Sequence, residues 1–138
     1  MRIPSKKLER PLNLLELLRA IQKRPAMYIG DQSRNRYSIW HLTSFITGFQ
    51  SGSIGRGPYQ EGDSVLDAFT FWVCTRFGIP DGAMDWAGHI WRQCGEDDEA
   101  AFRKFFELLE EYIKDRERLG PEEIKSRFMQ MMDKIRDS

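Results

Sequence analysis

Apolar side chains recur every three or four residues in six stretches of the chain, a spacing that aligns them on one face of an α-helix. These stretches predict helices over residues 12–23, 38–50, 64–77, 84–93, 97–119 and 121–136. No stretch alternates apolar and polar residues over the length of a strand. The sequence therefore predicts an all-α fold, a single irregular bundle of about six helices.

Turn-forming residues mark the predicted helix ends. Glycine ends three of the helices, at Gly78, Gly95 and Gly120. Pro121 follows directly and suits the first turn of the last helix. Ser64, with Asp67 three residues later, resembles a capping box and predicts the start of the third helix.

The composition fits one domain. The chain has 138 residues, of which 41% are hydrophobic and 12% aromatic, enough to fill a core. Residues 1–11 predict a basic extended arm and residues 12–138 a single helical domain. No apolar run approaches the roughly 18–20 residues that cross a membrane, and the start of the chain lacks the pattern of a signal peptide. Cys74 and Cys94 are too few for a disulfide scaffold, so we expect a cytoplasmic protein with reduced thiols.

The net charge of zero conceals a division between the two halves of the chain. Residues 1–60 contain ten Lys and Arg against three acids, whereas residues 61–138 contain eleven against eighteen. This division is compatible with one basic and one acidic face, which would steer a charged partner. It is equally compatible with two halves that attract each other across the core.

The sequence offers little catalytic machinery. His41 and His89 have no second His or Cys three or four residues away, so we predict no metal site. No nucleotide-binding or other cofactor fingerprint occurs, so we predict no cofactor. Cys94 close to His89 is the candidate nucleophile, and Asp85 one turn before His89 favours a pair on one helix face. The balance of these features predicts that the protein is not an enzyme.

The stretch from Lys23 to Asp31 resembles a segment near the start of the ATPase domain in type II topoisomerase B subunits. In that family the next helix supplies an acidic general base and a magnesium-binding Asn. Here the corresponding stretch, from Trp40 to Phe49, contains no Glu, Asp or Asn. The resemblance covers nine residues and implies no ATPase chemistry.

A second resemblance spans most of the chain. Its motifs are Arg24-Pro25-x-Met27-Tyr28-x-Gly30, Phe45-Ile46-x-Gly48-Phe49, Asp85-Trp86-Ala87-x-x-Ile90 and Glu99-x-Ala101-x-x-x-Phe105-Phe106-x-Leu108-Leu109. This order is similar to a group of small bacterial proteins, some of which resemble immunity proteins encoded with secreted polymorphic toxins. The sequence departs from that group by Asp85, where Gly often precedes the tryptophan, and by its last helix. The resemblance implies a binding protein and carries over no catalytic residue.

The first of these motifs has two interpretations. As architecture, Pro25 fixes a turn, Gly30 permits a crowded backbone position, and Arg24 bonds helix carbonyls or a carboxylate. As a site, a groove receives a peptide or ligand, and the residues that would form it are Arg24, Pro25, Met27, Tyr28, Gly30, Trp40 and Trp86. Four tryptophans cannot all lie in the core of so small a domain, and an exposed one would mark an interface.

Two kinds of partner fit the charge pattern. The first is a protein, such as a basic toxin nuclease, bound by an acidic face composed of Asp81, Asp85, Glu96, Asp97, Asp98 and Glu99. The same acids are equally typical of a solvated helix start. The second is a nucleic acid, bound by a basic face composed of Lys6, Lys7, Arg10, Arg34, Arg36 and Arg56. A pI near 6.7 disfavours the second partner, so we predict a non-catalytic, immunity-type inhibitor.

Overall fold

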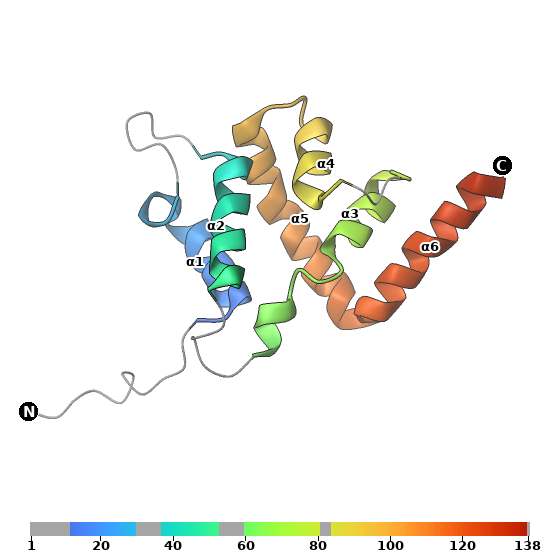
Figure 1. Ribbon diagram of the computed structural model, residues 1–138, viewed down its shortest axis with the longest axis horizontal. Coiled ribbons are helices and arrows are strands. Elements are labelled where there is room, and N and C mark those ends of the chain that lie inside the picture. The colour runs from blue at the N-terminus through green and yellow to red at the C-terminus, as the bar shows by residue number, and fades with distance from the viewer. Residues whose placement is uncertain (1–11, 30–36, 53–59, 81–83, 138) are drawn as a thin grey trace, which may run out of the picture.

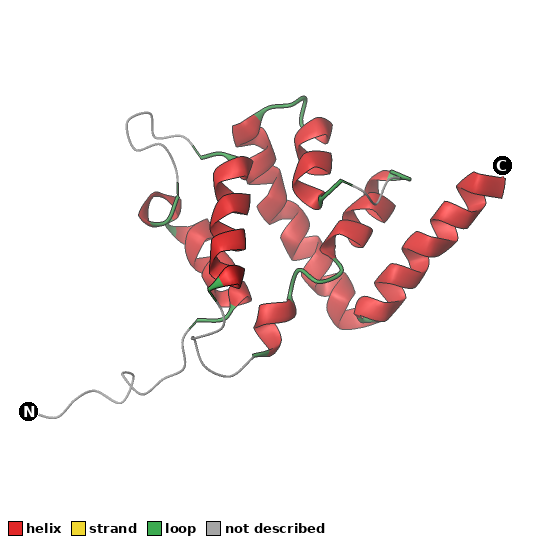
Figure 2. Cartoon of the chain, viewed as in Figure 1, coloured by secondary structure: helices red, strands yellow, loops and turns green. Residues whose placement is uncertain are grey.

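The computed structural model describes residues 12–29, 37–52, 60–80 and 84–137. Within these ranges it contains six α-helices, two short 3₁₀ helices and no strand (Figures 1 and 2), which confirms the predicted all-α bundle. The elements are α1 (Leu14–Lys23), η2 (Pro25–Met27), α2 (Ile39–Ser51), η3 (Glu61–Ser64), α3 (Phe69–Phe77), α4 (Trp86–Gln93), α5 (Asp98–Leu119) and α6 (Pro121–Asp137). None of these helices is long and apolar enough to cross a membrane. The predicted arm at residues 1–11 lies outside the described part of the chain.

Helix α5 forms the centre of the bundle. Helices α2, α4 and α6 pack against it, and α3 packs against both α4 and α6 (Figure 1). The side chains of α5 that repeat at helical spacing are buried, as the sequence pattern predicts. They are Ala101, Phe102, Phe105, Phe106, Leu108, Leu109 and Tyr112. This single apolar face therefore supplies the surface on which the other helices assemble.

The core is rich in aromatic rings and is organised around Phe69. Its ring lies 4.9 Å from the Tyr112 ring and 5.3 Å from the Trp86 ring, both in edge-to-face geometry. It stacks on Trp72 at 6.0 Å and meets Phe105 at 5.6 Å. These pairs join α3, α4 and α5 into one unit, and each adds to the free energy gained from burial alone.

The start of α3 differs from the prediction. The α-helix begins at Phe69, not at residue 64, and the preceding residues form η3 and a run of turns. The capping box predicted at Ser64 is wrong, because the Ser64 hydroxyl donates to the Glu61 carbonyl at 2.9 Å. Reciprocal capping occurs one turn earlier, between Gln60 and Asp63. Asp63 also accepts a hydrogen bond from the Leu14 backbone, so the first turn of α1 holds this segment in place.

The predicted glycine stops are confirmed. The backbone of Gly78 has φ 68° and that of Gly120 φ 84°, both in the region that favours glycine. Gly95, with φ 70°, follows the end of α4. Pro121 then begins α6. The sharp turn at Gly120 sends α6 back along α3, with the Phe71 and Phe128 rings in contact at 5.1 Å.

Candidate binding surface

An aromatic pocket of about 270 Å³ lies between α2 and α4. Trp40 on α2 and Trp91 on α4 form part of its wall, with ring centres 5.5 Å apart in edge-to-face geometry. Trp40 is 38% exposed, although it is a large aromatic side chain. Its position follows from the sequence, because it lies off the buried stripe of Ile39, Leu42 and Ile46. The pocket therefore presents indole surface to solvent, as binding hot spots do.

The acidic turn between α4 and α5 adjoins this pocket. The indole Nε1 of Trp91 donates to a carboxylate oxygen of Asp98 at 2.9 Å. The backbone N–H of Glu96 donates to the Trp91 carbonyl at 2.9 Å, with Glu96 held at φ 61°. The C-terminal end of α4 and the first turns of α2 and α5 lie close together in Figure 1. The structure thus joins part of the predicted acidic face to an aromatic pair of which Trp40 is exposed.

The remaining tryptophans lie in the core. Trp86 is only 6% exposed and packs against Phe105, with ring centres 4.8 Å apart. The groove predicted around Trp86 is therefore corrected, because this side chain offers almost no surface to a ligand. Trp72 is equally buried and donates through Nε1 to Asp115 at 2.8 Å. Trp40 is the tryptophan that the structure leaves exposed.

The Arg24–Tyr28 segment connects α1 to the rest of the fold. Pro25 begins η2, and Tyr28 packs edge-on against Phe45 of α2, with ring centres 6.1 Å apart. The backbone N–H of Arg24 donates to the Ala20 carbonyl and closes α1, while its guanidinium contacts the Met27 sulfur. These contacts favour the architectural interpretation of this segment.

Two members of the motif stand apart. Met27 is 67% exposed, so it is available to a partner and contributes little to the core. Gly30 lies outside the described residues.

The acids of the predicted acidic face have structural partners. Asp85 caps α4 through the Trp86 N–H and accepts from the Thr70 hydroxyl at 2.9 Å. Three of the remaining described members have partners near the start of α5. Asp97 caps α5, Asp98 accepts from Trp91, and Glu99 pairs with Arg103. Glu96 is exposed and forms no ion pair with a described residue, and Asp81 lies outside the described ranges. Four of the five described acids of this face are therefore engaged in helix caps, an indole hydrogen bond or an ion pair.

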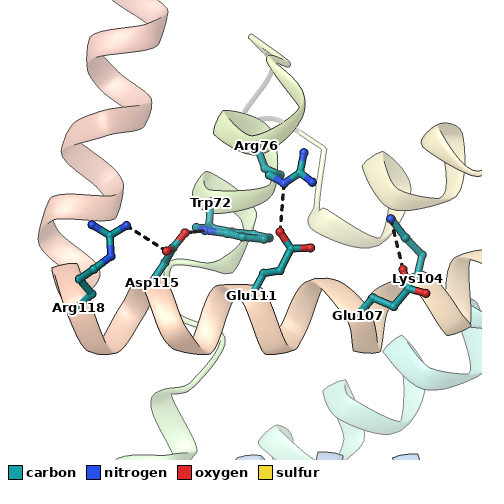
Figure 3. Close-up of polar contacts among 7 residues, drawn as sticks. All are labelled: Trp72, Arg76, Lys104, Glu107, Glu111, Asp115 and Arg118. Carbon is teal, nitrogen blue, oxygen red and sulfur yellow. Dashed lines mark hydrogen bonds and ion pairs between the residues drawn. The ribbon is translucent and has the colours of Figure 1, made fainter.

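Further along α5 the acids form surface ion pairs (Figure 3). Glu107 pairs with Lys104, and Glu111 pairs with Arg76 of α3. Arg19 of α1 pairs with Glu110 at 2.7 Å, which joins the basic half of the sequence to the acidic half. Exposed pairs of this kind contribute little stability individually. However, these ion pairs neutralise acids of α5 that, from the sequence alone, would be free to contact a partner.

The residues of the predicted basic face, Lys6, Lys7, Arg10, Arg34, Arg36 and Arg56, all lie outside the described residues. The nucleic-acid interpretation therefore stays a prediction.

The candidate nucleophile is poorly activated. Burial raises the pKa of the Cys94 thiol, and the opposing effect of nearby Lys104 does not cancel it. A thiol with a raised pKa holds little thiolate near neutral pH. His89 is buried in α4, and Cys74 is buried in the core as predicted. Within the described ranges, no three His, Cys, Asp or Glu side chains gather as metal ligands.

Asp115 accepts hydrogen bonds from two side chains, on α3 and α5 (Figure 3). The Trp72 indole N–H donates to one oxygen at 2.8 Å and Arg118 donates to the other at 3.1 Å. These bonds, Trp72 first, lower the pKa of Asp115 below its usual value. A pocket of about 200 Å³ between α3, α5 and α6 opens beside Asp115. No local pattern predicts this contact, because Trp72 and Asp115 lie on different helices.

We expect Asp115 to stabilise the fold near neutral pH. Asn at this position retains an acceptor for Trp72 but does not titrate. A lowered folded-state pKa stabilises the fold above the unfolded pKa of about 4, and the gain is lost as the pH falls below that value. Asp115→Asn should therefore lower the free energy of unfolding by about 1 kcal/mol at pH 7. This is a small value for a charged hydrogen bond, because the Asp115 side chain is 36% exposed and water screens its charge. Urea unfolding from pH 7 to pH 3 should show this difference in the free energy of unfolding shrink as the pH falls below about 4, and a constant difference would contradict the assignment.

Comparisons of the chain with protein-family models, with curated proteins and with solved structures found no match. The geometry of the described residues is therefore the basis for a functional proposal.

Proposed function

We propose that this protein is a non-catalytic protein-binding module that docks its partner at the Trp40–Trp91 pocket. The observation that carries the proposal is the exposure of Trp40, which is 38% accessible and lies over a second indole at 5.5 Å. Tryptophan at the centre of a pocket is a typical binding hot spot. The raised pKa of Cys94 supports a binding role over a nucleophilic one.

The chemistry around the pocket favours a basic partner. Glu96, Asp97 and Asp98 form the turn that flanks Trp91. Arg92 on the pocket wall, Arg103 and Lys104 are cations of the same region, and Arg103 is paired with Glu99. Hydrogen bonds from neutral groups leave the charges of Asp97 and Asp98 in place. A partner that inserts an apolar side chain and surrounds it with Lys or Arg would match both features.

The finer form of the proposal is an immunity-type inhibitor that occludes a bacterial toxin in the cytoplasm. Its support is the resemblance of the motifs to immunity proteins, together with the acidic flank of the pocket, which suits a toxin that binds phosphates. A nuclease that binds nucleic acid carries such a basic surface.

The test begins with the tagged full-length chain in its native lysate. We expect a stoichiometric protein partner that stays bound at high salt. That partner, produced alone, should inhibit growth, and co-production of this protein should restore it. A bound partner that is not toxic would overturn the proposal of a toxin inhibitor but would still support a protein-binding module. Nucleic acid released by salt, with no protein retained, would overturn both and favour the basic residues.

A further inference from the structure

A second pocket, of about 440 Å³, lies where α1, η3 and α5 meet. It shares no lining residue with the Trp40–Trp91 pocket, so an inference from it is independent of the proposed function. Its volume is typical of small-molecule sites. Part of its wall is apolar, formed by Leu15, Val65 and Ile113, and the rest is polar or charged.

The Gly62 backbone forms part of this wall because η3 approaches α1 closely. A Cβ at Gly62 would lie 2.4 Å from the Asn13 side chain, which caps α1. Asn13 in turn donates to the Gln60 side chain at 3.3 Å. These contacts hold the polar side of the pocket in a fixed position.

Arg116 lines the pocket and pairs with no carboxylate of the described residues. Its Nη2 donates to the Ser64 carbonyl at 3.4 Å and to the Ser64 hydroxyl at 3.2 Å. Its Nε is buried beside the Tyr112 hydroxyl, and neither atom forms a hydrogen bond of ordinary geometry with a described residue. A guanidinium carries five N–H donors in a fork that matches a carboxylate, and its partial burial without an anion is unfavourable. Arg116 therefore brings to the pocket wall a cation that forms no ion pair with a described residue.

Two acids accompany this cation. Glu61 and Glu117 also line the pocket, and both residues are exposed. Neither forms an ion pair with a described residue, whereas most acids along α5 do. The pocket thus combines a partly buried cation, exposed carboxylates and an apolar wall.

We propose that this pocket binds a small zwitterion, namely a free α-amino acid with an apolar side chain. Its carboxylate bonds the Arg116 guanidinium and its ammonium group lies toward Glu61 and Glu117. Its side chain rests on the apolar wall. This arrangement gives Arg116 a carboxylate partner and places each charge of the ligand against its opposite.

The probes are leucine, leucinamide and N-acetylleucine, titrated into the ¹⁵N-labelled full-length chain. Leucine should shift the amide signals of Gly62 and Arg116 in a saturable manner. Leucinamide lacks the carboxylate and N-acetylleucine lacks the ammonium, so each should bind at least about tenfold more weakly, as expected for loss of one charged hydrogen bond. No response to leucine, or an equal response to all three probes, would overturn the proposal.

Two variants locate the carboxylate contact. Arg116→Gln should weaken leucine binding at least about tenfold, the effect of one lost charged hydrogen bond. Arg118→Gln is the matched control, because Arg118 lies on the same helix but pairs with Asp115 and does not line the pocket. Equal losses in both variants would contradict the assignment. If Arg116→Gln fails to fold because the Ser64 contact is lost, the three probes on the unmodified chain still decide.

Discussion

Phe69→Ala should destabilise the fold by about 3–5 kcal/mol, the usual cost of removing a fully buried phenylalanine. The ring has no exposed surface and contacts four aromatic neighbours, Trp72, Trp86, Phe105 and Tyr112. These neighbours belong to three helices, so they cannot close the cavity by moving one side chain. Small domains have total stabilities of about 5–15 kcal/mol, so the loss removes a large part of the margin.

Urea unfolding followed by tryptophan fluorescence measures this loss. Phe77→Ala is the matched control, since Phe77 ends the same helix and is only partly buried. We expect the control to cost less than about half as much, because less apolar area is lost. Equal costs at the two positions would show that the core is not organised around Phe69. Retention of both Trp72 and Trp86 keeps the fluorescence signal comparable between variants.

The helices could be predicted because their apolar spacing is local information. The predicted bounds of α2, α5 and α6 lie within one or two residues of the observed ones. The predicted start of α3 was wrong for a physical reason. Asp63 bonds the Leu14 backbone, a contact between residues 49 positions apart that no local pattern encodes. Tertiary contact thus overrides the propensity of Ser64 and Asp67 to begin a helix.

The candidate site divides in the same way. The exposure of Trp40 is readable from the sequence, because the residue lies off the apolar stripe of its helix. Its contact with Trp91 is not readable, since the two lie on separate helices. The acids at residues 96–99 were identified, but their use as caps and indole acceptors depends on where α4 ends and α5 begins. That Arg116 forms no ion pair with a described residue likewise becomes visible only when η3 and α5 meet.

The structural roles of these acids also decide which charge variants can test the acidic turn beside the Trp40–Trp91 pocket. Reversal of Asp97 would remove the α5 cap and cost about 1 kcal/mol of stability, so weaker binding would be ambiguous. Glu96→Lys avoids the ambiguity, because the Glu96 side chain is exposed and forms no ion pair with a described residue. We expect it to slow association with a basic partner and to reduce the salt dependence of that association. Stopped-flow mixing at several salt concentrations measures both effects.

Trp40→Ala should weaken the complex with the partner at least about 30-fold, because hot-spot tryptophans contribute about 2 kcal/mol or more to binding. The same change should cost less than about 1 kcal/mol of folding free energy, since Trp40 is 38% exposed and lies outside the buried stripe. This separation is the signature of a binding residue. A core tryptophan such as Trp86, 6% exposed, should instead lose stability and binding together.

Titration calorimetry of the purified complex gives the affinity, and urea unfolding of the free protein gives the stability. His41→Ala is the matched control, because His41 is the next residue of α2, is also exposed and does not line the pocket. Its affinity should stay within about threefold of the unmodified protein, as most surface substitutions near an interface do. If Trp40→Ala and His41→Ala bind alike, the pocket is not the docking surface. The partner would then contact another exposed apolar side chain. Met27, which is 67% exposed, is the next position to test.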